Sequence, residues 1–291
     1  MGTLPADKVV QFKHDGFLSP FPLLDSAELL ACRQGVERYE AWLGAPINAH
    51  PDMKWRAMSY LLLPWAARLA RDPRILDKVE DLLGPDLLVF TSTFFIKEPH
   101  SPTIAAWHQD STYYGLEPKE SVTAWIALTE ASEAAGCMEA LSFQGRPRQF
   151  SHISRVVKHS VNRASQVITE PLDDLFKEGP PVAMPLEPGC FSLHHGLCPH
   201  RSGPNTTSHR RIGLGLHYTP TRTRPSGSVR HAALLVRGTD RYGHFESAPW
   251  ATDELGENEL KAHERAVGLY RNAYLEEEAR LAKRAGDLAP A

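Results

Sequence analysis

What this sequence lacks excludes several classes of protein. No apolar run approaches the roughly 18 residues that a membrane-spanning helix needs. The N-terminal residues show no basic stretch followed by an apolar one, as a secretory signal peptide would. The four cysteines form no CxxC pair and are too few for a disulfide framework in 291 residues. We therefore expect a cytoplasmic protein with no membrane partner.

Charge and missing motifs exclude further classes. The 32 Lys and Arg residues are balanced by 35 Asp and Glu residues, and this net charge of −3 offers no basic surface for nucleic acid. The motifs HExxH, GxSxG, GxGxxG and GxxxxGKS/T are absent, which disfavours zinc proteases, serine hydrolases, dehydrogenases and kinases. We expect a small molecule as the partner, bound by a monomer or a homodimer.

The N-terminal part, residues 1–85, is expected to be helical. Ser26 can cap one of its helices. A second helix is predicted between Asp72 as its cap and Gly84 as its stop, with Pro73 in the first turn. These helices precede the remainder of what we expect to be a single domain spanning the whole chain.

The character of the sequence changes after these helices. Short runs of β-branched and aromatic residues, separated by Pro, Gly and Ser, are typical of a sandwich or barrel of strands. They lie at residues 87–97, 121–129, 190–197, 211–219 and 231–238. This mainly β core is expected over residues 86–245, with a polar insertion at about 143–180 that is typical of a lid or a substrate-binding wall. Residues 255–285 predict an exposed C-terminal helix.

Three residues form a candidate metal site. His108 and Asp110 stand two positions apart, so in an extended segment their side chains point to the same side. His200 follows much later in the chain. Two imidazoles and one carboxylate cover one face of a metal ion and leave other positions open, which is how Fe(II) is held for oxygen chemistry. The alternative is a chance His-x-Asp on the surface.

A keto-acid co-substrate needs a cation for its distal carboxylate, and two arginines compete for that role. Arg211 follows His200 by eleven residues at the head of a predicted strand, and Ser202 could add a hydroxyl. A guanidinium binds a carboxylate bidentately and keeps its proton. Arg210 is the alternative anchor, because adjacent residues of a strand face opposite ways. The strand sequence RIGLGLHY does not decide which of the two points inward.

Together these motifs resemble the phytanoyl-CoA dioxygenase family. The resemblance rests on His-x-Asp at 108–110, His-x-Ser-x-Pro-Asn at 200–205, Arg-Arg-Ile-Gly at 210–213 and Tyr-x-Pro at 218–220. The segments DGFLSPFPLL, RILDKVEDLLGPDLL, AAGCMEAL and LLVRGTDRYGHFE extend it over most of the chain.

The resemblance implies a fold, a set of cofactors and site residues. The fold would be a double-stranded β-helix, a cupin-like jelly roll with flanking α-helices. The cofactors would be Fe(II), 2-oxoglutarate and O2, with His108, Asp110 and His200 as iron ligands. It favours Arg211 over Arg210 as the anchor, because Arg211 stands seven residues before the matching Tyr218. The remaining co-substrate residues that it implies are Ser202, Lys97, Thr93 and Trp125.

The reaction expected from the resemblance is hydroxylation of an unactivated C–H bond in a small metabolite or natural-product intermediate, with release of succinate and CO2. Related non-haem iron halogenases carry Gly or Ala where this chain has Asp110, so halogenation is not expected. Desaturation, epoxidation or cyclisation by the same centre stays open. A non-catalytic jelly-roll protein with a vestigial metal site is a further alternative, which predicts loss of a ligand or of the anchoring arginine, and none is lost here. A zinc hydrolase with the same three ligands is another, but it would have no use for Arg211 and Ser202. Residues 141–146 depart from the family's Pro-Gly-Ser-His turn, so no relative's substrate can be transferred.

Other polar and aromatic residues near these motifs have less specific roles. We name Tyr113, Tyr114 and Arg146 as candidates for substrate binding, with plain packing or a solvated loop as the alternatives. His194 and His195 precede His200 in a predicted strand. We interpret both as imidazoles of the core or of the surroundings of the iron site, and not as a second metal site.

Overall fold

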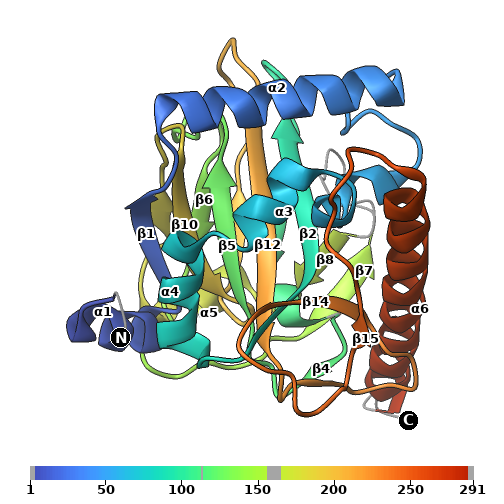
Figure 1. Cartoon of the computed structure of the whole chain (residues 1–291). Coiled ribbons are helices and arrows are strands. Elements are labelled where there is room, and N and C mark those ends of the chain that lie inside the picture. The colour runs from blue at the N-terminus through green and yellow to red at the C-terminus, as the bar shows by residue number, and fades with distance from the viewer. Residues whose placement is uncertain (1–3, 113, 156–164, 288–291) are drawn as a thin grey trace.

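The computed structural model describes residues 4–112, 114–155 and 165–287, and it shows two facing β-sheets with helices outside (Figure 1). The major sheet has the order β1-β10-β5-β12-β2-β14-β15 and the minor sheet the order β3-β11-β6-β9. The major strands are β1 (Phe17–Pro22), β2 (Leu87–Lys97), β5 (Val122–Ala127), β10 (Cys190–His195), β12 (Arg211–Pro220), β14 (Ala232–Arg237) and β15 (Glu246–Ser247). The minor strands are β3 (Ala105–His108), β6 (Met138–Ala140), β9 (Val182–Met184) and β11 (His200–Ser202). The predicted jelly-roll core with flanking helices is confirmed.

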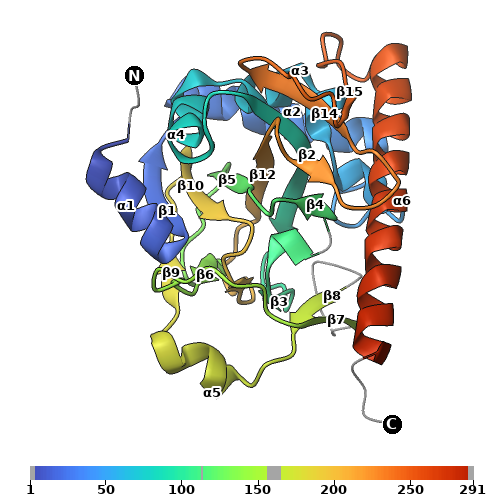
Figure 2. The same ribbon diagram turned by 90° about the horizontal axis from the view of Figure 1, so that it is seen from below.

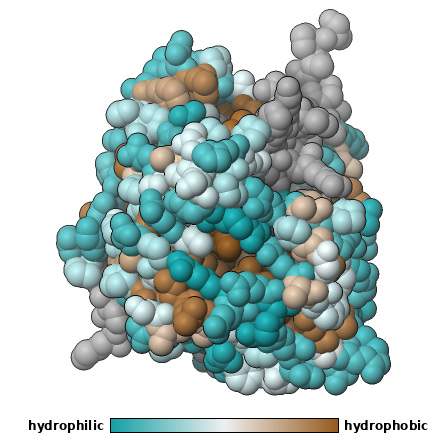
Figure 3. Space-filling model, turned by 90° about the horizontal axis from the view of Figure 1, so that it is seen from above, coloured by the Kyte–Doolittle hydropathy of each residue, from teal (hydrophilic) through white to brown (hydrophobic). Residues whose placement is uncertain are grey.

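The helices lie mainly on one side of the molecule. Those that cover the major sheet are α2 (Ser26–Leu43), α3 (Pro64–Ala70) and α4 (Pro73–Leu83), while α1 (Ala6–Asp15) lies beside β1 and α6 (Glu257–Asp287) lies along one flank. Figure 2 shows the minor sheet on the side away from α2–α4, together with α5 (Leu172–Leu175), β7 (His152–Arg155) and β8 (Ser165–Ile168). Seen from above, where α2 lies, hydrophobic residues form small separate groups within a largely hydrophilic surface (Figure 3). No helix among the described residues is long and apolar enough to cross a membrane.

Strand alternation separates the major sheet into an outer and an inner face. Phe94, Ile96 and Leu214 on the outer face belong to one buried cluster that also includes side chains of α2, α3 and α4. Helix α4 contributes a continuous apolar stripe to this cluster, in which Ile75 and Val79 are fully buried. Because the helices cover the outer face, the inner face is the one that carries Lys97 and Arg211, which are paired in the register of β2 and β12.

Two glycines shape the inner face of β12. An added Cβ at Gly213 would lie 2.1 Å from the Trp125 indole, and one at Gly215 would lie 2.9 Å from the Phe95 ring. The two aromatic rings therefore lie over the glycines, inside the barrel. Residues of one strand that are two apart share a face, so Arg211 points inward together with Gly213 and Gly215.

A Gly213→Ala variant is expected to lose about 1–3 kcal/mol of unfolding free energy, because the new methyl group overlaps the indole of Trp125. Gly268→Ala is the matched control, since Gly268 lies in α6 with no neighbouring atom within 4 Å. That control should leave stability unchanged or raise it by up to about 1 kcal/mol. Urea unfolding of both variants measures the difference, and equal stabilities would show that Gly213 does not contact the indole.

Several sequence predictions are matched closely and others need correction. Strand β2 spans the predicted residues 87–97, and α4 has Asp72 at its N-cap and Gly84 at its C-cap, as predicted. The helical prediction for residues 1–85 is wrong at β1, which pairs with β10 and extends the major sheet. Ser26 is not the cap of α2, because the side chain of Asp25 accepts the free N–H groups of Ala27 and Glu28. Within the insertion lie β7, β8 and α5, and residues 156–164 of it are outside the described part.

Candidate metal centre

Three side chains meet between the two sheets. His108 ends β3 and His200 begins β11, and the two residues are paired in the antiparallel register. Asp110 follows in a short helical turn. Its Oδ1 lies 3.7 Å from Nε2 of His108 and 3.8 Å from Nε2 of His200, and the ligand atoms of the three residues all lie within 4.8 Å of one another. This spacing suits three donors around one ion.

Backbone carbonyls orient both imidazoles. Nδ1 of His108 donates to the carbonyl of Ala106 at 2.8 Å, and Nδ1 of His200 donates to that of Cys198 at 3.0 Å. With the proton on Nδ1, the lone pair of each Nε2 faces Asp110 and is free for a metal. Burial lowers the pKa of His200 well below its usual value, with a further contribution from His108. The neutral ring is the form that binds metal ions.

The carboxylate of Asp110 has two different oxygens. Oδ1 faces the two imidazoles, whereas Oδ2 accepts hydrogen bonds from Thr123 Oγ1 at 3.2 Å and from Nε2 of His194 at 3.3 Å. Burial alone would raise the pKa of Asp110, but the imidazoles of His200, His194 and His217 together hold it well below its ordinary range. The hydrogen bonds to Oδ2 therefore fix the orientation of the carboxylate, and Oδ1 is left facing the two imidazoles.

Two buried basic residues, Arg211 in the wall of the same cavity and Lys97 behind Ser202, lie close to the three candidate ligands. The side chains of Lys97 and Arg211 are 0% and 3% exposed. Nζ of Lys97 donates to Ser202 Oγ at 2.7 Å and to the carbonyl of Gly203, and Nη1 of Arg211 donates to the carbonyl of Gly136 at 2.5 Å. Burial, with repulsion from Arg211, lowers the pKa of Lys97 to about 6, and burial lowers that of Arg211 to about 10.

Neither cation has an acidic partner. In the described ranges no carboxylate forms a salt bridge with Lys97 or Arg211, and Nε of Arg211 is buried without a hydrogen-bond partner. Buried charges are normally paired, so the Arg211 guanidinium calls for an anionic ligand, and Lys97 beside it could add a hydrogen-bond donor. The cavity is lined by Arg211 and Ser202 as well as by the three candidate metal ligands. Fe(II) and a dicarboxylic keto acid fit these residues.

The structure separates the two candidate arginines. Arg210 points away from the cavity and forms a bidentate pair with Glu40 at 2.8 and 3.0 Å and a further pair with Glu98 at 2.9 Å. Its charge is compensated by these carboxylates. Only Arg211 is placed to receive an anion inside the barrel.

The other predicted co-substrate residues are placed differently from one another. Trp125 lines the cavity, and the Arg211 guanidinium lies 5.3 Å from its ring. Thr93 is on the inner face of β2, opposite Gly215 in register, but it is not among the residues that line the cavity. Phe95, two residues along the same strand, takes the position at the cavity wall.

Two of the predicted substrate-binding residues lie away from the metal cavity, and the third cannot be placed. Tyr113 is outside the described residues. Tyr114 is buried behind the site, where its ring packs edge-on against Phe90 and its hydroxyl contacts Nδ1 of His217 at 2.9 Å. It belongs to the core and does not line the cavity.

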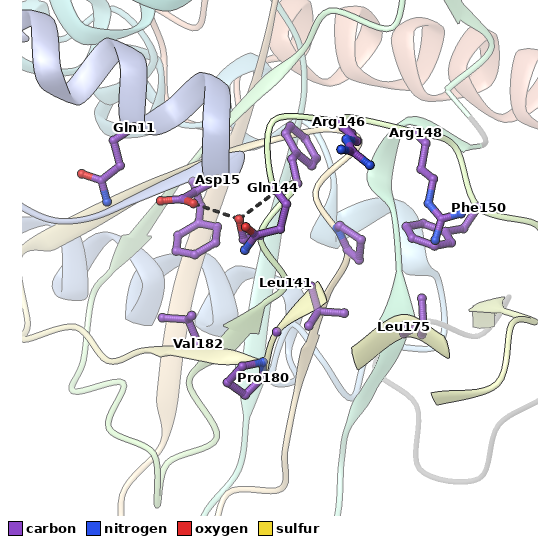
Figure 4. A pocket seen from close by; sticks show the side chains of 15 residues that line it. Gln11, Asp15, Leu141, Gln144, Arg146, Arg148, Phe150, Leu175, Pro180 and Val182 are labelled. Carbon is purple, nitrogen blue, oxygen red and sulfur yellow. Dashed lines mark hydrogen bonds between the residues drawn. The ribbon is translucent and has the colours of Figure 1, made fainter. Parts of the chain in front are cut away.

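Arg146 lies at a separate pocket of about 400 Å³ between α1, the loop after β6 and α5 (Figure 4). The lining of this pocket shares no described residue with that of the metal cavity. The loop is held there because the backbone N–H groups of Phe143 and Gly145 donate to carbonyls of α1. Arg146 therefore lies outside the metal cavity, and its role in substrate binding stays a prediction.

The sequence analysis missed His217 and Thr123. Both line the cavity, and Thr123 Oγ1 lies 2.9 Å from Nδ1 of His217 while it also contacts Asp110. His217 could have been predicted from its position on β12. It stands an even number of residues after Arg211, so the two side chains lie on the same face of the strand. His194 contacts Asp110 as an imidazole of the surroundings, whereas the His195 ring packs beside Phe12 and Phe143.

Gln109, between two candidate ligands, ties the metal-binding loop to the insertion. Its fully buried side chain donates to the carbonyls of Arg148 at 2.8 Å and Leu197 at 2.5 Å, and it accepts from the backbone N–H of Phe150 at 2.8 Å. Its own backbone N–H donates to Nε2 of His152 at 3.0 Å. The position of the insertion is therefore coupled to that of the metal loop.

A Gln109→Met variant is expected to lower the free energy of unfolding by about 1–3 kcal/mol, because it leaves the Phe150 N–H and two part-buried carbonyls without their partner. Urea unfolding measures the loss. Gln11→Met is the control: Gln11 is half-exposed and bonds only the exposed Lys8 side chain, so a change within about 0.5 kcal/mol is expected. An unchanged midpoint for Gln109→Met would contradict the coupling.

Known proteins resemble this chain in sequence and in structure. The family model of phytanoyl-CoA dioxygenase matches residues 12–213. A probable alpha-ketoglutarate-dependent hypophosphite dioxygenase of Stutzerimonas stutzeri is 29% identical over 184 residues, which cover 62% of this chain and 58% of that protein. An ectoine dioxygenase of Bordetella parapertussis is 29% identical over 161 residues, which cover 50% of this chain and 51% of that protein. The chain thus spans little more than half the length of these curated relatives.

A solved structure matches over a greater length. The non-heme monooxygenase ThoJ, in its apo form, superimposes with a TM-score of 0.81 at 28% identity, and the match covers 94% of this chain and 99% of that one. The likeness includes the helices that flank the two sheets as well as the sheets themselves, since nearly the whole of both chains is aligned.

Proposed function

Because the chain belongs to the phytanoyl-CoA dioxygenase family, we propose that it is an Fe(II)- and 2-oxoglutarate-dependent dioxygenase that hydroxylates an unactivated C–H bond of a small molecule. The observation that carries this proposal is the combination of two features in one cavity. One is the His108, Asp110 and His200 donor set, and the other is the buried Arg211 guanidinium, which has no acidic partner among the described residues. Names of relatives that include alpha-ketoglutarate-dependent and ectoine dioxygenases support it.

Each residue of the cavity has a defined task in this proposal. His108, Asp110 and His200 would hold Fe(II) through two neutral nitrogens and one carboxylate oxygen. Arg211, with Lys97 and Ser202 beside it, would bind the distal carboxylate of 2-oxoglutarate and thereby set its direction. When bound, iron and 2-oxoglutarate together supply the activation of O2, and succinate and CO2 are released. The rings of Phe95 and Trp125 form apolar walls that exclude water from this space.

The donor set also bears on the alternatives. Asp110 occupies the position that related halogenases leave without a carboxylate, so oxidation of the substrate is favoured over halogenation. Desaturation, epoxidation and cyclisation would use the same residues with another pose of the substrate. A zinc hydrolase or a non-catalytic protein would gain nothing from burying Lys97 and Arg211 beside the metal at the cost of their hydration.

Anaerobic titration of the protein with Fe(II) and then 2-oxoglutarate tests the proposal. We expect a weak visible charge-transfer band that requires both additions, and release of succinate once O2 and a suitable substrate are admitted. Absence of the band, together with tight binding of zinc, would favour the hydrolase or binding-protein alternatives.

A further inference from the structure

One polar side chain in the wall of the metal cavity has no task in the proposed function. His217 lines this cavity and is 3% exposed. Its Nδ1 lies 2.9 Å from the hydroxyl of Tyr114 and 2.9 Å from Oγ1 of Thr123. The other ring nitrogen, Nε2, has no hydrogen-bond partner among the described residues and is open to the cavity. This nitrogen is therefore available to a molecule bound there.

The neighbouring glycine on β12 keeps this nitrogen accessible. An added Cβ at Gly215 would lie 3.4 Å from Nε2 of His217 and 2.9 Å from the Phe95 ring, so a larger side chain would crowd Nε2. His194 offers a contrast. It also lines the cavity, but its Nε2 contacts Asp110 and its Nδ1 is buried without a partner. Of these two histidines, only His217 turns a nitrogen towards a bound molecule.

The hydrogen bonds at Nδ1 decide which nitrogen of His217 carries the proton. Thr123 has one hydroxyl proton, which it donates to Oδ2 of Asp110 at 3.2 Å. Nδ1 of His217 is the only acceptor that the described residues offer to the hydroxyl of the buried Tyr114. If Nδ1 carried the ring proton, this hydroxyl would be a buried donor without an acceptor, which is unfavourable. Nδ1 therefore accepts from Tyr114, and the ring proton is on Nε2, where it faces the cavity.

His217 stands at the metal end of the inner face of β12. Along this face the strand carries Arg211, two glycines and then His217, so no side chain of β12 lies between the two polar residues. Nδ1 of His217 is 3.8 Å from Oδ2 of Asp110, one of the three candidate ligands. A dicarboxylic keto acid that is anchored at Arg211 and reaches these ligands therefore ends next to His217.

We infer that Nε2–H of His217 donates a hydrogen bond to the metal-side carboxylate of 2-oxoglutarate, so that one strand holds the co-substrate at both ends. This inference rests on the proposed function, because it takes 2-oxoglutarate as the co-substrate. A keto acid that chelates a metal uses one oxygen of this carboxylate, and the other oxygen remains a negatively charged acceptor. Hydrogen bonds to charged acceptors are the stronger ones. His217 is thus a co-substrate-binding residue, and Tyr114 positions its proton on Nε2.

Two keto acids separate the two ends of the co-substrate. 2-Oxovalerate has the chain length and the metal-binding end of 2-oxoglutarate but lacks the distal carboxylate. Each keto acid is added under nitrogen, without substrate, to protein saturated with Fe(II), and the amplitude of the visible band gives its Kd. We expect His217→Asn to weaken both keto acids about tenfold, and Arg211→Gln to weaken 2-oxovalerate less than about twofold. If His217→Asn weakened 2-oxoglutarate alone, or neither keto acid, the inference would be wrong.

Two amide side chains separate a contact with the co-substrate from a purely structural role of the ring. His217→Asn places its amide near the position of Nδ1, so it keeps an acceptor for Tyr114 and loses the donor to the cavity. His217→Gln places its amide near the position of Nε2, so it keeps that donor and loses the acceptor. We expect His217→Gln to bind both keto acids within about threefold of the wild type. The opposite order of the two variants would show that His217 serves only to hold Tyr114, and would overturn the inference.

A spectroscopic readout guards against indirect effects. The visible band of His217→Asn should lie at shorter wavelength than that of the wild type, because a hydrogen bond to the bound keto acid lowers the energy of the orbital that accepts the electron. Competition with a chelator should give an unchanged affinity for Fe(II). An unshifted band, or a loss of Fe(II) affinity as large as the loss of keto-acid affinity, would assign the effect to Asp110 and contradict a direct contact.

Tyr114→Phe is a second variant that leaves His217 in place. It keeps the aromatic ring that packs against Phe90 and removes only the hydroxyl. The ring proton of His217 can then move to Nδ1 and bond Thr123, so both keto acids should bind about threefold more weakly. Unchanged affinities would show that Tyr114 does not hold the proton on Nε2.

Failure of this inference and failure of the proposed function can be told apart. If the wild-type protein with Fe(II) and 2-oxoglutarate shows no band, both are wrong. If the wild type shows the band and the His217 variants bind both keto acids as it does, the assignment of His217 alone is wrong.

Discussion

An Asp110→Asn variant is expected to bind Fe(II) about a hundredfold more weakly than the wild-type protein, because it replaces the one anionic donor by a neutral amide of equal size. The loss has two causes. The amide oxygen is a weaker ligand for a divalent cation, and the two remaining donors are neutral imidazoles that do not balance the charge of the ion. Anaerobic titration with Fe(II), followed by competition with a chelator of known affinity, measures the change.

The control for this experiment is a nearby carboxylate that faces elsewhere. Glu139 on β6 pairs with Arg201 and does not line the metal cavity, so Glu139→Gln should leave the affinity for Fe(II) unchanged. Circular dichroism and thermal unfolding verify that both variants fold. If Asp110→Asn bound Fe(II) as tightly as the wild type does, the assignment of Asp110 as a ligand would be wrong.

An Arg211→Gln variant is expected to raise the Kd for 2-oxoglutarate about a hundredfold while the affinity for Fe(II) stays unchanged. A bidentate, charge-assisted pair in a buried site is lost, and the shorter amide has one donor group to offer in its place. Removing a hydrogen bond to a charged group costs about 1.5–3 kcal/mol per bond. The amplitude of the visible band as a function of 2-oxoglutarate concentration gives the Kd.

Arg210→Gln is the matched control, because it removes the same charge one residue earlier in the chain. Arg210 pairs with Glu40 and Glu98 outside the cavity, so its loss should change stability by a modest amount and leave the Kd for 2-oxoglutarate unaltered. If the two variants weakened co-substrate binding equally, a general electrostatic effect would replace the specific role of Arg211. The pair thus separates the two alternatives that the sequence left open.

Many elements of the fold follow from local sequence signals. Helix α4 begins and ends where its capping residues stand, and β2 spans the predicted apolar run, because caps and strand-forming residues act over a few positions. The first strand was missed because Phe17–Pro22 is short and contains two prolines, which disfavour a strand assignment. It forms a strand because it lies at the edge of the major sheet, where only one neighbour has to be paired.

The sequence by itself determined the candidate metal ligands. The spacing of His108 and Asp110 predicts that their side chains point the same way, and the resemblance to the family adds His200. Only the tertiary structure decided whether Arg210 or Arg211 faces inward. Alternation along a strand gives two faces, and the face on which the helices pack is the outer one. Likewise, Tyr114 and Arg146 stand near the motifs in sequence, yet core packing and the attachment of a loop to α1 place them elsewhere. The pocket in Figure 4 could not be predicted either, because its walls come from segments far apart in the chain that meet only in the folded protein.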